Sequence, residues 1–133
     1  VSKTLRAKKL LKRLPKRALN NLEILKYVKL LNLPHFRGVF MRNELNKLIP
    51  RKNEMGIVNL DVSSGKGTHW VAYSKRGDCI KFFDSFGLRP PPEVTRYFKG
   101  SRMVFHNERV QQYDESNCGH LCLKFLIKES GLM

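Results

Sequence analysis

The stretch VQQYDESNCGHLCLKF, residues 110–125, decides how this chain is organised. Apolar residues recur at helical spacing in its second half and predict a helix over residues 117–128. Cys118 falls in the first turn of that helix, where unpaired N–H groups and positive potential favour a thiolate over a thiol. Because the thiolate is the reactive form of cysteine, the start of this helix is predicted to carry a nucleophile.

Two further chemically capable side chains lie upstream, at the ends of predicted strands. His69 stands in GTHWVAY and Asp84 in FFDSFG. Strands are predicted over residues 69–74 and 79–84, joined by a tight hairpin whose Arg-Gly-Asp tripeptide is interpreted as a turn needing glycine for positive φ. We expect this hairpin to bring Asp84 near His69, so that the carboxylate orients the imidazole through Nδ1.

Each of these residues has a plain structural interpretation when taken alone. A lone histidine is more often structural, an aspartate after a strand is usually a turn residue, and a cysteine is usually a small buried hydrophobe. Together with glutamines six and seven residues before Cys118, they supply a base, an orienting acid, an amide donor and a nucleophile. This combination is typical of a cysteine protease.

The same stretch does not predict a metal site. Cys118, His120 and Cys122 stand at alternate positions, and residues two apart on a helix point away from each other. Cys122 falls one turn after Cys118 and is expected to pack in the core. We therefore expect no zinc site.

Composition bounds the class of protein. The chain has 133 residues, enough for one domain, and 26 Lys+Arg against 11 Asp+Glu give a formal net charge of +15. Such an excess favours polyanionic partners: nucleic acid, an acidic substrate or a membrane surface. The chain has three cysteines, a small and odd number that argues against a disulfide framework. Such sparse cysteines indicate a reducing, intracellular compartment. No apolar run approaches the roughly 18 residues of a membrane span.

The N-terminal residues 1–19 are predicted to form a basic arm, separate from a domain over residues 20–133. Eight lysines and arginines and no acid lie between Lys3 and Arg17. Like-charge blocks of this kind are often solvated and disordered. Clustered Lys/Arg is also typical of a nuclear-import signal or a DNA-binding arm. In the DNA-binding interpretation the contacts come from Lys8, Lys9, Lys12, Arg13, Lys16 and Arg17.

The remaining pattern predicts a mixed set of elements. Asn20 or Asn21 caps a helix that runs to residue 31 and stops near Pro34. Residues 36–40 form a turn or short extended piece, residues 50–54 a loop, and residues 57–62 a strand. Pro92 opens a short helix over residues 92–98, and residues 103–105 and the region of Val110 form the last strands. The class is α+β, with a mixed or antiparallel sheet.

The motifs GTHWVAY, FFDSFG and Gln-x6-Cys-Gly-x2-Cys resemble those of the adenovirus-type cysteine endopeptidases. This family is distantly related to the SUMO-specific proteases and includes versions carried by virus-like DNA transposons. The resemblance covers residues 22–127 and implies a papain-like, SUMO-protease-like core. It implies that His69 is the general base, Asp84 its orienting acid and Cys118 the nucleophile. Gln111 would supply the oxyanion-hole amide, with Gln112 the alternative at the spacing of the SUMO-protease branch.

The resemblance also implies a substrate class. Trp70 and Gly119 would line the substrate channel, with Trp70 narrowing it so that glycine enters. Substrates would be capsid or core precursor proteins of a virus or transposon, cleaved at small, Gly-containing sites by a monomeric enzyme in the virion or host nucleus. The adenoviral enzymes usually have Glu where this chain has Asp84, whereas the SUMO-protease branch has Asp.

Activators and rival functions stay open. The adenoviral type is activated by a disulfide-linked peptide, and because no cysteine lies between Cys79 and Cys118 this mode is disfavoured. No cofactor is expected for the chemistry, and DNA or an unlinked peptide is the candidate activator. One alternative is a protease of ubiquitin-like conjugates. The other is a non-catalytic, basic nucleic-acid-binding protein.

Overall fold

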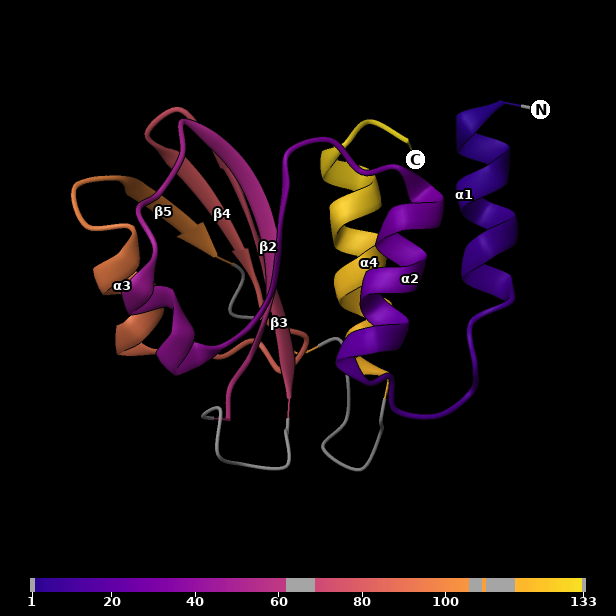
Figure 1. Ribbon diagram of the computed structural model, residues 1–133, viewed down its shortest axis with the longest axis horizontal. Helices are drawn as coiled ribbons and strands as arrows, with labels where there is room; N and C mark the ends of the chain where they lie inside the picture. Colours follow the sequence, from indigo (N-terminus) through magenta and orange to yellow (C-terminus); the bar gives the residue numbers. More distant parts are fainter. Residues whose placement is uncertain (1, 62–68, 106–108, 110–116, 133) are drawn as a thin grey trace.

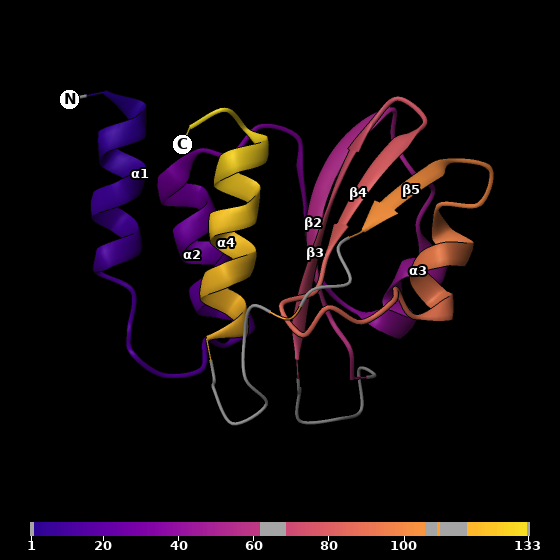
Figure 2. The same ribbon diagram turned by 180° about the vertical axis from the view of Figure 1, so that it is seen from behind.

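The computed structural model describes residues 2–61, 69–105, 109 and 117–132. The described elements are helices and strands, and Figures 1 and 2 show them from opposite sides. In chain order they are α1 (Lys3–Lys12), α2 (Asn21–Leu31), β1 (Phe36–Met41), the 3-10 helix η1 (Arg42–Lys47), β2 (Asn53–Asn59), β3 (Trp70–Arg76), β4 (Cys79–Phe83), α3 (Pro92–Tyr97), β5 (Arg102–Phe105) and α4 (Cys118–Glu129).

The strands form one mixed sheet in the order β1-β2-β3-β4-β5. The two central pairs, β2 with β3 and β3 with β4, are antiparallel, whereas the outer pairs β1 with β2 and β4 with β5 are parallel. The predicted α+β class is therefore confirmed, with a mixed sheet. The predicted hairpin is also present, and Gly77 at its turn has φ +61°, a conformation that glycine adopts without strain.

The sheet separates two groups of helices. Helices α1, α2 and α4 lie on one side of it, and α3 with η1 lies near its other side (Figures 1 and 2). A hydrophobic core lies on each face of the sheet, and alternate residues of β3 pack into one or the other. Ala72 packs with α2 and α4, whereas Val71 and Tyr73 pack with α3 and η1. A strand buried on both faces gives a fixed platform for side chains at its ends.

Helix α2 forms where the sequence predicts it. The Asn20 side chain accepts from the Glu23 N–H and the Glu23 carboxylate accepts from the Asn20 N–H, which completes a capping box. The helix ends at Asn32, whose left-handed backbone (φ 52°) closes the last turn before Pro34 is reached.

The sequence leaves residues 36–40 open between a turn and a short extended piece, and it does not predict the start of β2. The extended alternative is found for residues 36–40, since β1 pairs in parallel with β2 along Phe36–Met41. Strand β2 begins at Asn53, inside the predicted loop. In both cases a neighbouring strand supplies hydrogen bonds that the local pattern does not reveal. The predicted strand near Val110 lies outside the described residues.

The N-terminal segment also differs from the expected separate arm. Ser2 caps α1 by accepting from the Leu5 N–H, and Ala7, Leu14 and Leu19 are buried in the same core as α2 and α4. Apolar residues at helical spacing among the lysines are the physical reason, because they give α1 one face that packs. Among the described helices, none has the length and apolarity needed to span a membrane.

Candidate active site

His69 and Asp84 meet at one end of the β3–β4 hairpin. His69 directly precedes β3 and Asp84 directly follows β4. The His69 Nε2–H donates to Asp84 Oδ1 at 2.6 Å, and the same oxygen accepts from the Phe86 backbone N–H at 2.9 Å. The expected contact through Nδ1 is wrong: Asp84 uses Nε2, which leaves Nδ1 as the ring nitrogen facing the rest of the site.

Phe86 is a site residue that the motif analysis missed. Its ring stacks on the His69 imidazole, with centroids 4.0 Å apart and planes 6° from parallel. Together with Asp84, this stacking fixes both the rotation and the tilt of the imidazole. The sequence signal was an aromatic residue two positions after Asp84, but the pattern alone does not say which way that ring points.

Cys118 is brought to His69 by packing between α4 and β3. It is the first residue of α4, preceded by Asn117 at the N-cap position. The His69 and Cys118 side chains interact, and each shifts the pKa of the other. The Trp70 backbone N–H also donates to Cys118 Sγ, at 3.5 Å across 48 positions of sequence. The sulfur therefore lies between a histidine and two backbone donors, since the Gly119 N–H contributes as well.

The electrostatics of this arrangement favour an ion pair. Burial on its own lowers the pKa of His69, but Asp84 and then Cys118 outweigh it and raise that pKa to about 9. Burial on its own raises the pKa of Cys118, but the His69 hydrogen bond, followed by the backbone N–H of Trp70, brings that pKa below its ordinary value. A raised histidine pKa beside a lowered cysteine pKa favours a thiolate–imidazolium pair over the neutral pair.

All three side chains are largely withdrawn from water. The exposed fractions of His69, Asp84 and Cys118 are 8%, 4% and 7%. Charges in such surroundings interact more strongly than charges at the surface, because the effective dielectric constant is lower. The described structure thus brings together the predicted base, acid and nucleophile. Gln111 and Gln112 lie outside the described residues, and the oxyanion-hole assignment stays a prediction.

Trp70 and Gly119, the predicted channel residues, lie in contact beside the nucleophile. A Cβ placed on Gly119 would stand 3.3 Å from the Leu19 Cβ and 3.4 Å from the Trp70 Cδ1. The Trp70 indole N–H donates to the Leu19 carbonyl at 2.9 Å. The His120 Nε2–H donates to the Pro15 carbonyl at 2.5 Å. The segment between α1 and α2 therefore holds both the start of β3 and the start of α4.

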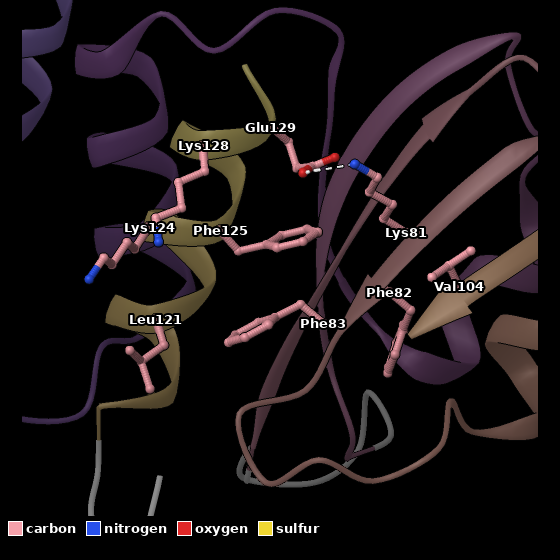
Figure 3. Close-up of a pocket in the computed structure, with 9 residues that line it drawn as sticks. All are labelled: Lys81, Phe82, Phe83, Val104, Leu121, Lys124, Phe125, Lys128 and Glu129. Carbon is pink, nitrogen blue, oxygen red and sulfur yellow. Dashed lines mark ion pairs between the residues drawn. The ribbon is translucent and has the colours of Figure 1, made fainter. Parts of the chain in front are cut away.

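A cleft of about 500 Å³ lies between α4 and the strands β4 and β5 (Figure 3). Phe83 and Phe125 point toward one another across it, stacked with centroids 5.2 Å apart, and Lys81 pairs with Glu129 at 3.6 Å. Phe83 directly precedes Asp84, and Phe125 lies on the nucleophile helix. This aromatic pair therefore joins the end of β4, next to Asp84, to the helix that carries Cys118.

The basic residues predicted to bind DNA fall into two groups. Lys8, Lys9 and Lys12 are exposed on α1, and Arg13 and Lys16 are exposed after it. Arg17 is different, because its guanidinium donates to both carboxylate oxygens of Glu23 at 2.8 and 2.7 Å.

The described cysteines are unpaired, and they differ in burial. Cys122 is fully buried in the core, as predicted, and burial raises the pKa of its thiol. Over the described parts of the chain, no group of three or more His, Cys, Asp or Glu side chains is placed to hold a metal ion.

No family model matches the chain. It is 37% identical over 70 residues to the SUMO-1 cysteine protease of a South African tick isolate of African swine fever virus, covering 48% of this chain and 26% of that protein. It is 45% identical over 47 residues to the cysteine protease of a Malawian tick isolate, covering 32% of this chain and 17% of that protein. The chain thus spans about a quarter or less of the length of these curated relatives.

A solved structure extends the similarity to the fold. The crystal structure of the African swine fever virus protease superposes with a TM-score of 0.62 at 18% identity, over 88% of this chain and 59% of that one. The expected adenovirus-type assignment is finer than these similarities and stays a prediction. The chain shares the α+β fold of a viral cysteine protease, and it is similar in sequence to cysteine proteases named for SUMO-1.

Proposed function

We propose that this protein is a cysteine endopeptidase in which His69, Asp84 and Cys118 form the catalytic set. The observation that carries the proposal is the position of the His69 ring, held by Asp84 on one nitrogen, next to Trp70, whose backbone N–H donates to Cys118 Sγ at a helix start. The sequence similarity to viral cysteine proteases supports the same conclusion.

The geometry supports an acyl-enzyme mechanism. His69 holds the proton released by Cys118, and the thiolate attacks the carbonyl carbon of the scissile peptide. The negative oxygen that forms is stabilised by the Cys118 backbone N–H and, in our proposal, by the side chain of Gln111, with Gln112 the alternative; one such donor is typically worth about 3–4 kcal/mol. His69 then protonates the leaving amine, and water hydrolyses the thioester with His69 as base.

The proposed substrates are precursor polypeptides cleaved at small, Gly-containing sites, as for capsid or core proteins of a virus or transposon. The contact of Trp70 with Gly119 beside Cys118 supports this, because a large buried indole next to the nucleophile leaves little room for side chains entering there. The second candidate is a protease of ubiquitin-like conjugates, which the name of the related SUMO-1 cysteine protease favours.

The test is a comparison of two substrate sets. Wild-type protein and Cys118→Ala are incubated with fluorogenic peptides ending in Gly-Gly or Gly-Ala, and with intact ubiquitin-like conjugates. Cleavage of the free peptides, lost in Cys118→Ala, is the result expected of an endopeptidase of precursor proteins. Cleavage confined to the conjugates would establish the second candidate, and no Cys118-dependent cleavage of any substrate would overturn both.

The net charge of +15 supports a further part of the proposal, that the enzyme associates with DNA where it works, in the virion or host nucleus. Such binding would be sequence-independent, and its affinity would fall steeply with salt. Anisotropy of a labelled duplex at low and moderate salt tests it, and undetectable affinity at low salt would rule it out. Binding without any Cys118-dependent cleavage would instead favour a non-catalytic nucleic-acid-binding protein.

A further inference from the structure

A second groove, separate from the catalytic residues, lies between α1 and α4. Its volume is about 500 Å³, and its far end reaches the first turn of α4, where His120 and Leu121 follow Cys118. Figures 1 and 2 show α1 and α4 running in opposite directions on the same side of the sheet. The lining residues are Leu5, Lys8, Lys9, Leu11, Lys12, Leu14, His120, Leu121 and Lys124.

The floor of this groove is apolar and incompletely covered. Among the residues of α1, Ala7 is the buried one, so the helix approaches its neighbours through a small side chain. Leu5 on the same helix is 44% exposed, and Leu11 and Leu121 are half-buried. Removing apolar surface from water is favourable, so a ligand that covers these leucines gains free energy.

The rim of the groove carries charge of one sign. Lys8, Lys9 and Lys12 border it on α1 and Lys124 borders it on α4, and none of the residues that line it is acidic. Positive charge on both walls attracts carboxylates or phosphates. The phosphates of a nucleic acid would bind the lysines, but a nucleic acid would leave the leucines on the floor of the groove exposed to water. A peptide with leucines on one face and carboxylates beside them matches both the floor and the rim.

We propose that this groove docks an acidic, amphipathic helical segment of the protein substrate. A groove between two helices is a common receptor for such a segment, which presents apolar side chains at helical spacing. Because the groove ends one turn from Cys118, a docked segment holds the rest of the substrate close to the nucleophile. The link to cleavage rests on the proposed function, whereas the docking itself does not.

Binding is measured by fluorescence anisotropy with the full chain carrying Cys118→Ala, so that cleavage does not interfere. The probe is a helix-forming peptide of about 15 residues, built from Leu, Glu and Ala with the leucines on one face. The comparison peptide has the same composition with its leucines spread around the helix. We expect the amphipathic peptide to bind at least ten times more tightly; equal affinities would overturn the proposal.

Two double variants separate the effect of the charges on the rim from the effect of the net charge of the protein. Lys8→Glu with Lys12→Glu is expected to weaken peptide binding by tenfold or more. Lys26→Glu with Lys99→Glu, at exposed positions away from the groove, changes the net charge equally and is expected to leave binding unchanged. Equal weakening by both pairs would show that only net charge matters and would overturn the docking site.

Leu5→Ser distinguishes peptide from polyanion, since it changes the floor without changing charge. We expect it to weaken peptide binding about fivefold and to leave binding of a DNA duplex or an anionic vesicle unaltered. Unaltered peptide binding would overturn the proposal and would assign the lysines to a polyanion. Circular dichroism of each variant confirms that the fold is retained.

The active enzyme then tests the link to cleavage. Attaching the amphipathic peptide to a cleavable substrate is expected to lower KM, and Lys8→Glu with Lys12→Glu is expected to restore the higher KM without changing kcat on the short substrate. Absence of all cleavage with intact peptide binding would overturn the proposed function and leave the docking site standing. Cleavage with no effect of the attached peptide would overturn its use as a substrate-docking site.

Discussion

Asp84 holds the His69 imidazole by Nε2 at 2.6 Å, and the Phe86 backbone N–H holds the same carboxylate oxygen at 2.9 Å. Asp84 therefore orients His69 while its own position is fixed by the loop that follows β4. Among the groups that raise the pKa of His69 against the effect of burial, Asp84 has the largest effect.

Asp84→Asn is expected to lower the pKa of His69 from about 9 and so to raise the pKa of Cys118. Each unit of pKa changes the thiolate population of a mostly protonated cysteine about tenfold, so labelling of Cys118 by iodoacetamide at pH 7 is expected to slow by about tenfold or more. Asp78→Asn, in the hairpin turn, is the control. Unchanged labelling in Asp84→Asn would contradict the proposed role.

Peptidase activity is expected to depend on pH as a bell-shaped curve. Below the lowered pKa of Cys118 the thiolate is protonated, and activity falls. Above about pH 9 His69 loses the proton that the leaving amine needs, and activity falls again. The pKa values read from the two limbs belong to the coupled Cys118–His69 pair and not to either residue alone. The profile of kcat/KM between pH 5 and 10 checks this, and an alkaline limb near the ordinary histidine value of 6.5 would contradict it.

Trp70→Phe is expected to destabilise the fold by about 1–3 kcal/mol, the cost of leaving a buried polar group without its partner. Phenylalanine keeps a ring in the core but removes the indole N–H that donates to the Leu19 carbonyl. Urea unfolding followed by circular dichroism measures the change. Tyr27→Phe, on a partly exposed side chain of α2, is the matched control and is expected to change stability little.

Phe125→Ala is expected to cost about 3 kcal/mol of stability, at the lower end for loss of an aromatic ring because Phe125 is half-buried. The loss of its stacking on Phe83 also frees the strand that leads into Asp84. Cys118 labelling at pH 7 is therefore expected to slow as well. Phe125→Leu keeps most of the apolar contact and is expected to show smaller effects on both. Lower stability with unchanged labelling would show that the aromatic pair does not position Asp84.

The sequence predicts those elements whose signals are local. Asn20 marks the start of α2, Pro92 opens α3, and the spacing after Asn117 marks α4, each within a residue or two of the structure. The hairpin between β3 and β4 was predictable because Gly77 marks its turn. These features depend on neighbours in the chain, which a sequence displays directly.

The elements that the sequence does not predict depend on distant partners. The sequence does not decide between a turn and an extended piece for residues 36–40 until β2 pairs with β1, and α1 looks like a charged arm until Ala7 packs against the other helices. The same is true within the site. His69, Asp84 and Cys118 follow from their motifs, but the ring nitrogen that meets Asp84 and the stacking of Phe86 depend on the path of a loop.

The hydrogen bond between His120 and Pro15 joins positions 105 residues apart, and that between Trp70 and Leu19 joins positions 51 apart. Contacts of such long range carry a cost in chain entropy and slow folding, because the intervening chain must be brought together before they can form. During synthesis the first partner of each pair leaves the ribosome long before the second. His69 and Asp84 are made before Cys118 as well, so a growing chain holds no complete catalytic set. The hydrogen bond from the Trp70 N–H to Cys118 Sγ spans 48 positions as well, so the surroundings of this thiol are complete only when α4 packs against β3.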